Sequence, residues 1–550
     1  MRGYALAGSW SGIQGPAKGR SFDRGRRLPA PWGGAAAAVV LALISAFYAG
    51  LGLVALCFAP VALEAAALPL EPASRAAAVL TDTVYLPVVA FAEPHIPVAS
   101  VLTPFDANTT DLVGPASWAA NYGKTPEIIV ASNGVALDVL AQDYNPETPW
   151  TAVLLHIEPR STGNDYRVSQ ALTAAPMLDR VMGLAVDDCG NRYYATGVDE
   201  SSLVNATYPP PDVSRSNIVR VVKLDPAGNV LFNVDLDMAR RAFAPQAEMI
   251  INPMVAATAR LALGGNELAL VHGINTAADP NIGGARHQKA LSTRLSADGA
   301  ILRTSSVWVS HSFDHRLLYD GEGMIEHHLG DAYPRYLVFG RNHISYPLFH
   351  IKGELGENLT ATRLGDIALI EADPTYRYLA LFVSETSSVA GCIFDGRING
   401  PRNLAAVRVS RADNSIDPSL PDTLTVISAD VQRTNRLRWL TAYSDASHLH
   451  AERPKLIAIG GDRYAVLWEE WLNTGEWTDT YHGVYGMVID ARGNTLRGAR
   501  LLTSQHHLPR GDDAFLLNGR AAWMTGNGAE RKLYIHFVDA ALSYQCVTLD

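Results

Sequence analysis

The chain repeats one pattern of short strands and turns seven times, and this repetition limits its fold more than any other feature. Each unit has a half-polar strand, a turn, a strand rich in aromatic or β-branched residues, a connection, a third strand, a turn with Asp, Gly or Asn, and a final strand. The units begin near residues 126, 182, 259, 315, 365, 455 and 514. Repeats of four short strands are typical of β-propeller blades. A single blade cannot cover both of its apolar faces, whereas a closed ring of blades covers all of them.

Turn residues recur at one place in the unit. Residues 225–229 (DPAGN), 298–299 (DG) and 490–494 (DARGN) stand between the third and fourth strands, where a hairpin needs positive φ. We therefore predict an all-β fold, a seven-bladed β-propeller of four-stranded antiparallel blades, over residues 83–550. Two tandem β-sandwiches are the alternative, and they would not require seven units of one pattern. The last unit looks one strand short, and we predict that a strand near residues 84–90 completes it and joins the two chain ends.

One unit carries a more specific motif. Residues 186–197 read VDDCGNRYYATG, which resembles the signature of bacterial seven-bladed β-propeller repeat proteins and of related NHL-type propellers. The match is good in this unit and degenerate in the others. The resemblance implies propeller architecture alone, because those families contain binding scaffolds as well as enzymes and no functional residue carries over from them.

The N-terminal region is unlike the rest of the chain. Residues 1–27 hold six basic residues and one acidic residue, and no further charge occurs before Glu64. The nearly continuous apolar stretch is longer than the 7–15 residues of a signal-peptide core and long enough to cross a bilayer. We predict a basic cytoplasmic segment (1–34), a transmembrane or signal-anchor helix (35–63) and a linker (64–82). The positive-inside rule then exports the propeller, which is anchored in the cell membrane, or secreted if the N-terminal segment is cleaved.

Net charge limits the kinds of binding partner, and cysteine content limits the number of disulfides. Removing residues 1–63 takes away six bases and one acid, so the net charge changes from −10 to −15. An acidic domain has no basic field for nucleic acid, which excludes that partner. The exported part has three cysteines, Cys189, Cys392 and Cys546, which allow at most one disulfide and leave its pairing open.

Candidate site residues come from the connections at one end of the predicted channel, those from outer to inner strands and those between second and third strands, where propellers carry ligand sites. The candidate ligand-binding residues are His311, Asp314, His315, His343, Asp445, His448, His450, His506, His507 and Asp512. Three of them, His311, His315 and His450, are candidate ligands for a divalent metal such as Zn or Ca. The alternative is that polar loops collect His and Asp without forming a site, since no pair has a diagnostic spacing.

Three hypotheses about the function follow from these observations. The first is a non-enzymatic binding or scaffold module for a protein or glycan ligand, held at the membrane by its N-terminal helix. The second is a metal- or cofactor-dependent enzyme, either an oxidoreductase or a carbohydrate-active lyase or hydrolase. The third is a structural spacer without a ligand. A group of aromatic residues between Trp468 and Tyr485 is expected to pack between blades, with an exposed subset free to stack on sugar rings.

Overall fold

The computed structural model describes nineteen stretches of the 550-residue chain. They are residues 95–101, 128–143, 151–160, 165–178, 180–197, 218–237, 249–251, 259–279, 285–307, 315–330, 336–341, 344–350, 362–386, 401–428, 431–444, 446–473, 479–509, 512–527 and 530–549. The predicted basic segment, membrane helix, linker and strand near residues 84–90 lie outside these stretches. Within them, the structure contains no helix with the length and apolar character needed to cross a membrane.

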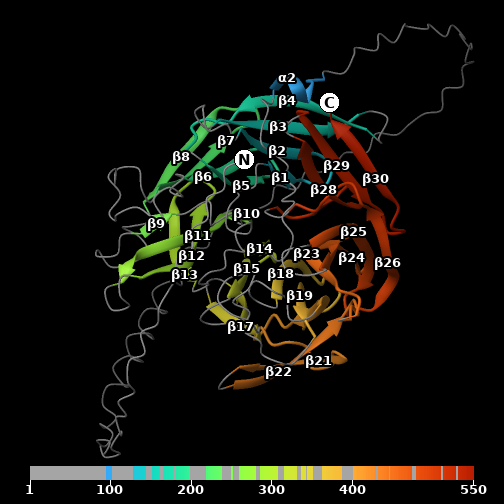
Figure 1. The fold of residues 1–550 in the computed structure, drawn as a ribbon. Coiled ribbons are helices and arrows are strands. Elements are labelled where there is room, and N and C mark those ends of the chain that lie inside the picture. Colours follow the sequence, from blue (N-terminus) through green and yellow to red (C-terminus); the bar gives the residue numbers. More distant parts are fainter. Residues whose placement is uncertain are drawn as a thin grey trace, which may run out of the picture. The chain divides into compact units, whose positions relative to one another are not determined.

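Seven antiparallel sheets follow one another along the described chain and are numbered here as blades 1–7 (Figure 1). Blade 1 is β1 (Ile128–Ser132), β2 (Leu137–Asp143), β3 (Thr151–Pro159) and β4 (Tyr166–Thr173). Blade 2 is β5 (Arg180–Val186), β6 (Arg192–Gly197), β7 (Ile218–Leu224) and β8 (Val230–Asp237). Blade 3 is β10 (Arg260–Gly264), β11 (Glu267–Asp279), β12 (Ala285–Ser296) and β13 (Ile301–Val307), with β9 (Met249–Ile251) paired to β11.

The remaining blades repeat this order from the inner to the outer strand. Blade 4 is β14 (His315–Tyr319), β15 (Met324–Gly330), β16 (Tyr336–Arg341) and β17 (Ile344–His350). Blade 5 is β18 (Thr362–Leu369), β19 (Tyr378–Glu385), β20 (Arg402–Val409), β22 (Val431–Trp439) and β21 (Asp422–Ser428), in spatial order. Blade 6 is β23 (Leu449–Ala458), β24 (Arg463–Asn473), β25 (Asp479–Asp490) and β26 (Thr495–Thr503). Blade 7 is β27 (Phe515–Leu517), β28 (Arg520–Asn527), β29 (Lys532–Val538) and β30 (Tyr544–Leu549).

The blades form a closed ring, which confirms the predicted seven-bladed propeller. Each inner strand contacts the inner strand of the next blade, and β27 of blade 7 contacts β1 of blade 1. Seven apolar clusters fill the seven interfaces between neighbouring blades, one cluster to each interface. Two blades differ from the four-stranded prediction by a fifth strand, β9 in blade 3 and the β21–β22 hairpin in blade 5.

The ring closes without the predicted strand. All four strands of blade 7 come from residues 515–549, so the expectation that this blade needs a strand from upstream is wrong. Its first strand, β27, is only three residues long, which is why the pattern seemed incomplete. Backbone and side-chain hydrogen bonds join the two blades instead. Asn518 N donates to Gly134 O (2.8 Å), Asn518 Nδ2 donates to Tyr166 Oη (2.6 Å), and Ser132 Oγ donates to Leu516 O (2.9 Å).

A short segment upstream of blade 1 also crosses this junction. Ile96 N donates to Val168 O of blade 1 (2.9 Å), and Arg531 Nη1 of blade 7 donates to Ala99 O (3.3 Å). One helical turn, α2 (Val98–Val101), packs against β29, and Val98 is fully buried in the apolar cluster between blades 7 and 1. The described segment upstream of blade 1 therefore contacts the C-terminal blade through hydrogen bonds and the buried side chain of Val98.

The hairpins have the turn chemistry that the sequence predicts. In residues 187–191, 225–229 and 490–494, the first Asp accepts hydrogen bonds from the backbone N–H and the side-chain amide of the Asn four residues later. Gly228, Gly299 and Gly493 have φ of 91°, 90° and 76°, which confirms positive φ at these turns. These short hairpins all lie at one end of the propeller, and the longer connections lie at the other.

Changing Val98 to Ala should weaken the closure. The change removes two methyl groups from a fully buried position, at about 0.8 kcal/mol for each apolar carbon before any cavity cost. We expect the free energy of unfolding of the full-length protein to fall by about 1.5–3 kcal/mol in chemical denaturation. Val135→Ala, at a side chain that is 56% exposed, is the control and should change it little.

Changing Gly460 to Ala tests the need for positive φ in the hairpins. Gly460 has φ of 81°, whereas Gly498 has no positive φ, and a Cβ built at either residue meets nothing within 4 Å. The pair therefore isolates backbone conformation from crowding. Gly460→Ala should cost about 1–2 kcal/mol of unfolding free energy, and Gly498→Ala should cost none. Equal stabilities for the two variants would contradict this account of the turns.

Candidate functional site

Six charged residues come together along the inner strands and the connection to blade 7, and we call them the channel cluster. Four lie on inner strands and two lie in the connection that precedes β27. They are Arg260 (β10), Arg316 (β14), Asp366 (β18), Lys455 (β23), Asp512 and Asp513. Successive strands of a blade alternate in direction, so each outer strand ends where the next inner strand begins. The topology thus brings these residues, far apart in sequence, to one mouth of the channel.

Hydrogen bonds and ion pairs connect the channel cluster around the ring. Arg260 Nη2 donates to Asp513 Oδ1 (3.0 Å), and Arg316 Nε lies 2.6 Å from Asp366 Oδ1 and 3.5 Å from Asp513 Oδ1. Lys455 Nζ donates to the backbone oxygen of Asp512 (2.5 Å). Val130 N on β1 donates to Asp512 Oδ2 (2.9 Å), which links the cluster to blade 1. Hence Asp512 and Asp513 interact with blades 1, 3, 4 and 6.

Most of the channel cluster is buried. Arg260, Arg316, Asp366 and Lys455 are each at most 6% exposed, whereas the side chain of Asp513 is 38% exposed. Buried charges persist in proteins when they are paired and hydrogen bonded, and every one of these four has such a partner. Asp512 and Asp513, which are both half-buried, are therefore more accessible to an incoming molecule than the four buried members of the cluster.

The environment separates the pKa values of the two neighbouring carboxyl groups. Burial raises the pKa of Asp512 to about 7, and the negative charge of Asp513 adds to that rise. Burial also acts to raise the pKa of Asp513, but the charges of Arg260, Arg316 and Lys455 outweigh it and lower the pKa. Asp512 can therefore hold a proton near neutral pH while Asp513 stays ionised. Such a pair can donate and accept hydrogen bonds side by side, and it is an arrangement that acid–base catalysts use.

The histidines that the sequence predicts as site residues lie apart from the channel cluster where the structure describes them. His315 is fully buried between blades 3 and 4, with its Nδ1 2.9 Å from Nδ1 of His328. His450 is buried and accepts a hydrogen bond from Arg402 N at Nδ1 (3.2 Å). His448 is exposed.

The two histidines before blade 7 also have packing roles. The ring of His507 stacks on Tyr481 at 3.9 Å, and the half-buried ring of His506 packs against His536. Of the predicted site residues that the structure describes, only Asp512 belongs to the channel cluster. His311, Asp314, His343 and Asp445 lie outside the described residues.

One placement is corrected by the topology. The connection that contains residue 343 joins β16 to β17, the third and fourth strands of blade 4, and not the second and third. It therefore belongs to the short-hairpin end, opposite the channel cluster. Within the described stretches, no three His, Cys, Asp or Glu side chains are placed to hold a metal ion. The candidate metal site includes His311 and stays a prediction. Cys189 and Cys546 are free thiols.

Sequence reasoning missed the strand-borne members of the cluster. Arg260 and Arg316 stand at the starts of β10 and β14, and Asp366 stands in the middle of β18; all three strands are otherwise largely apolar. A charged residue on the inner strand of several units could have indicated this cluster, because inner strands line the channel of a propeller. Trp468 and Trp471, by contrast, are buried as predicted, and Trp477 lies outside the described residues.

Comparisons with known proteins give likenesses of fold only. No family model matches the chain, and no curated protein matches it. Among solved structures, it is similar to the β-propeller domain of the Trilobed protease from Pyrococcus furiosus (6% identity, 78% of this chain and 98% of that chain, TM-score 0.38). It is also similar to GH43 BlXynB from Bacillus licheniformis (9% identity, 71% and 57%, TM-score 0.29). A third is an α-L-arabinanase from Penicillium chrysogenum (9% identity, 53% and 92%, TM-score 0.28).

Changing Asp512 to Asn should alter how stability depends on pH. The pKa of Asp512 is about 7 in the folded protein against about 4 for an unfolded chain, so the folded state binds the extra proton between these values. This group therefore favours folding below pH 4, and its contribution is lost as pH rises towards 7. Relative to Asp512→Asn, the wild type should lose melting temperature between pH 4 and 7. Asp188→Asn, an exposed carboxylate in the β5–β6 turn, is the control and should run parallel to the wild type.

Proposed function

We propose that the protein is a glycan-binding propeller whose channel cluster contacts the ligand. The observation that carries this proposal is the convergence of three cations and three carboxyl groups from several blades, with Asp513 open at the mouth. Sugar hydroxyls both donate and accept hydrogen bonds, and they are matched by neighbouring groups of both kinds. Guanidinium and carboxylate groups held by rigid strands can orient such hydroxyls without a cost of ordering.

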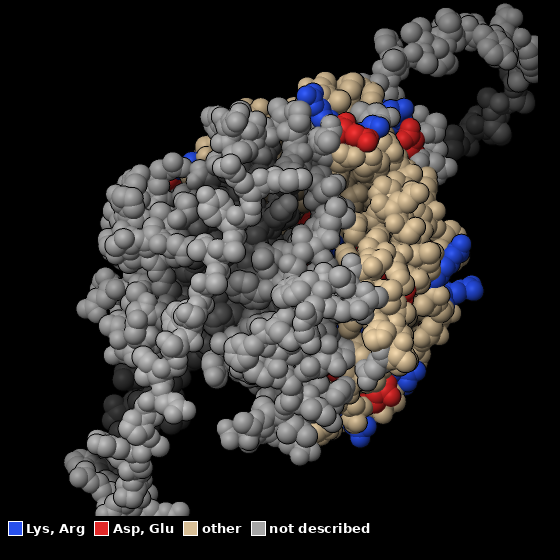
Figure 2. All heavy atoms as spheres, viewed as in Figure 1, with Lys and Arg blue, Asp and Glu red and all other residues tan. Residues whose placement is uncertain are grey.

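The burial of the cationic side chains in the channel cluster favours a glycan over a protein surface as the ligand. The cationic side chains of the cluster are at most 6% exposed, so a flat protein surface has little to contact there. A sugar unit or chain end is small enough to approach the partly exposed Asp513 and the groups behind it. In Figure 2, Lys and Arg stand beside Asp and Glu in small mixed groups at the edge of the described surface.

Extracytoplasmic presentation is part of the same proposal. Its support is the basic flank of residues 1–27 followed by the long apolar stretch that ends before Glu64. The propeller would then meet glycans outside the cell, held at the membrane by the N-terminal helix or released after cleavage.

A second candidate function, glycoside hydrolysis, is favoured by the two pKa values. Hydrolases of this kind use one protonated carboxyl to donate to the leaving oxygen and one ionised carboxylate to act on the other side of the bond. Asp512, with a pKa of about 7, suits the first role, and Asp513, with a lowered pKa, suits the second. Lys455 Nζ donates to the backbone oxygen of Asp512, so its charge would offset part of the negative charge that develops when Asp512 gives up its proton.

Binding to a glycan array tests the proposal. The full-length protein should bind at least one glycan, and Asp513→Asn should weaken that binding about tenfold, because a charge-assisted hydrogen bond contributes roughly 1.5–3 kcal/mol. Asp188→Asn should bind like the wild type, and melting curves would show that each variant is folded. No bound glycan, or equal affinities for the two variants, would reject the channel mouth as a glycan site.

The same glycans separate binding from hydrolysis. Release of reducing ends that is lost in Asp512→Asn, with binding retained, would assign the hydrolase. Binding without release of reducing ends would assign the binding module.

A further inference from the structure

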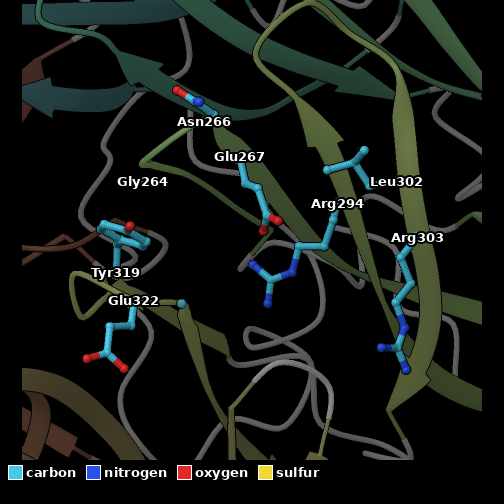
Figure 3. Close-up of a pocket in the computed structure, with 9 residues that line it drawn as sticks. Gly264, Asn266, Glu267, Arg294, Leu302, Arg303, Tyr319 and Glu322 are labelled. Atoms are coloured by element: carbon cyan, nitrogen blue, oxygen red, sulfur yellow. The ribbon is translucent and has the colours of Figure 1, made fainter. Parts of the chain in front are cut away.

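A cleft of about 520 Å³ opens between blades 3 and 4 at the short-hairpin end, away from the channel cluster (Figure 3). Arg260 begins β10 at the channel mouth, and Gly264 ends the same strand at the cleft, so the two sites lie at opposite ends of it. The lining residues that matter here are Asn266, Glu267, Arg294, Leu302, Arg303 and Tyr319. This volume falls in the range of roughly 300–1,000 Å³ that is usual for small-molecule sites.

The floor of the cleft contains a guanidinium group with one unused donor. Arg294 is 3% exposed, and its Nη2 donates to Glu326 Oε1 (2.6 Å). Its Nη1 is buried and has no hydrogen-bond partner among the residues that the structure describes. Glu326 also accepts from Ser292 Oγ (2.6 Å) and carries a pKa lowered to about 2; burial opposes this shift, but His328, Arg294 and Ser292 outweigh it. Glu326 already balances the charge of Arg294. A ligand group that accepts a hydrogen bond from Arg294 Nη1 should therefore be neutral and not an anion.

The rim adds polar groups of opposite sign. Glu267 and Arg303 are both exposed, and neither side chain has a hydrogen bond or ion pair within the described stretches. Their charges cancel, so the rim gives no preference for a charged ligand. Glu322, the third charged residue at the rim, is already paired with Arg341 (3.0 Å) and Arg411. Glu267 and Arg303 are therefore left to act as acceptor and donor for a polar, uncharged molecule.

The sides of the cleft are apolar. Leu302 is 53% exposed, and the half-buried ring of Tyr319 lies against the β10–β11 hairpin. A Cβ at Gly264 would come within 2.0 Å of Tyr319 Cγ, so the glycine permits this close approach. Tyr319 Oη donates to Gly321 O (3.1 Å), which holds the ring at the cleft. Figure 3 shows Arg294 and Glu267 pointing into the space between Tyr319 and Leu302.

We propose that this cleft is a second binding site, for a neutral sugar ring. A sugar ring has an apolar face suited to Tyr319, and its hydroxyls can accept from Arg294 and donate to Glu267. The inference does not depend on the channel cluster, because no residue is shared between the two sites.

Calorimetric titration of the full-length protein with neutral oligosaccharides tests the site. The probes are maltotriose, cellotriose, xylotriose and chitotriose, with galacturonic acid and glycylglycine as charged comparisons. At least one neutral probe should bind, and Glu267→Gln and Tyr319→Ala should each weaken it about fivefold. Glu371→Gln, an exposed carboxylate in the corresponding hairpin of blade 5, should leave it unchanged. Asp513→Asn should also leave it unchanged, which separates this site from the channel mouth.

Two results would overturn the proposal. One is binding of the neutral probes that both cleft variants retain in full, which would place the sugar elsewhere. The other is no binding of any neutral probe, whether or not the charged ones bind. Melting curves of Glu267→Gln are expected to stay close to those of the wild type, because that side chain is exposed and makes no hydrogen bond or ion pair within the described stretches.

Discussion

The burial of each blade against its two neighbours is the constraint on which this structure depends. A twisted four-stranded sheet has two apolar faces and no independent core, so it is stable only when both faces are covered. The seven apolar clusters between blades meet that need, and the cluster between blades 7 and 1 joins the last blade of the chain to the first and includes Val98 of the segment upstream of blade 1. Asn518 and Val98 stabilise this junction from either side.

The ring places short hairpins at one end of the molecule and long connections at the other. The short hairpins form from Asp, Asn and Gly in the right order, and their backbone has little conformational freedom. The long connections and the starts of the inner strands meet at the other end, where charged side chains can face a channel. Between these ends, the junction of blades 3 and 4 is polar: among the described residues its apolar cluster is the smallest of the seven, and Arg294, Glu326 and His328 lie buried beside it. Both proposed sites use places where the ring departs from apolar packing.

Much of the fold could be predicted, and little of the site. Repetition, alternation and turn residues are local signals, and they gave seven blades and the positive φ of residues such as Gly228 and Gly493. The three-residue strand β27 was too short to register, which led to the expectation of a strand contributed from upstream. Histidines expected in loops were predicted as site residues because imidazole can bind metals and polar ligands. In the structure, His315 and His507 pack against other rings. Only Asp512 among the predicted residues that are described is part of the channel cluster.

The amino-acid sequence by itself determined the architecture, because each strand and turn depends on residues within a few positions of it and the pattern recurs seven times. The tertiary structure alone decided which charged groups meet. Arg260, Arg316, Asp366 and Lys455 are separated by tens of residues, and their encounter depends on the direction of every inner strand and on closure of the ring. Their burial and their mutual charges in turn separate the pKa values of Asp512 and Asp513. Electrostatic properties of this kind arise from distances in space, which the order of residues along the chain does not contain.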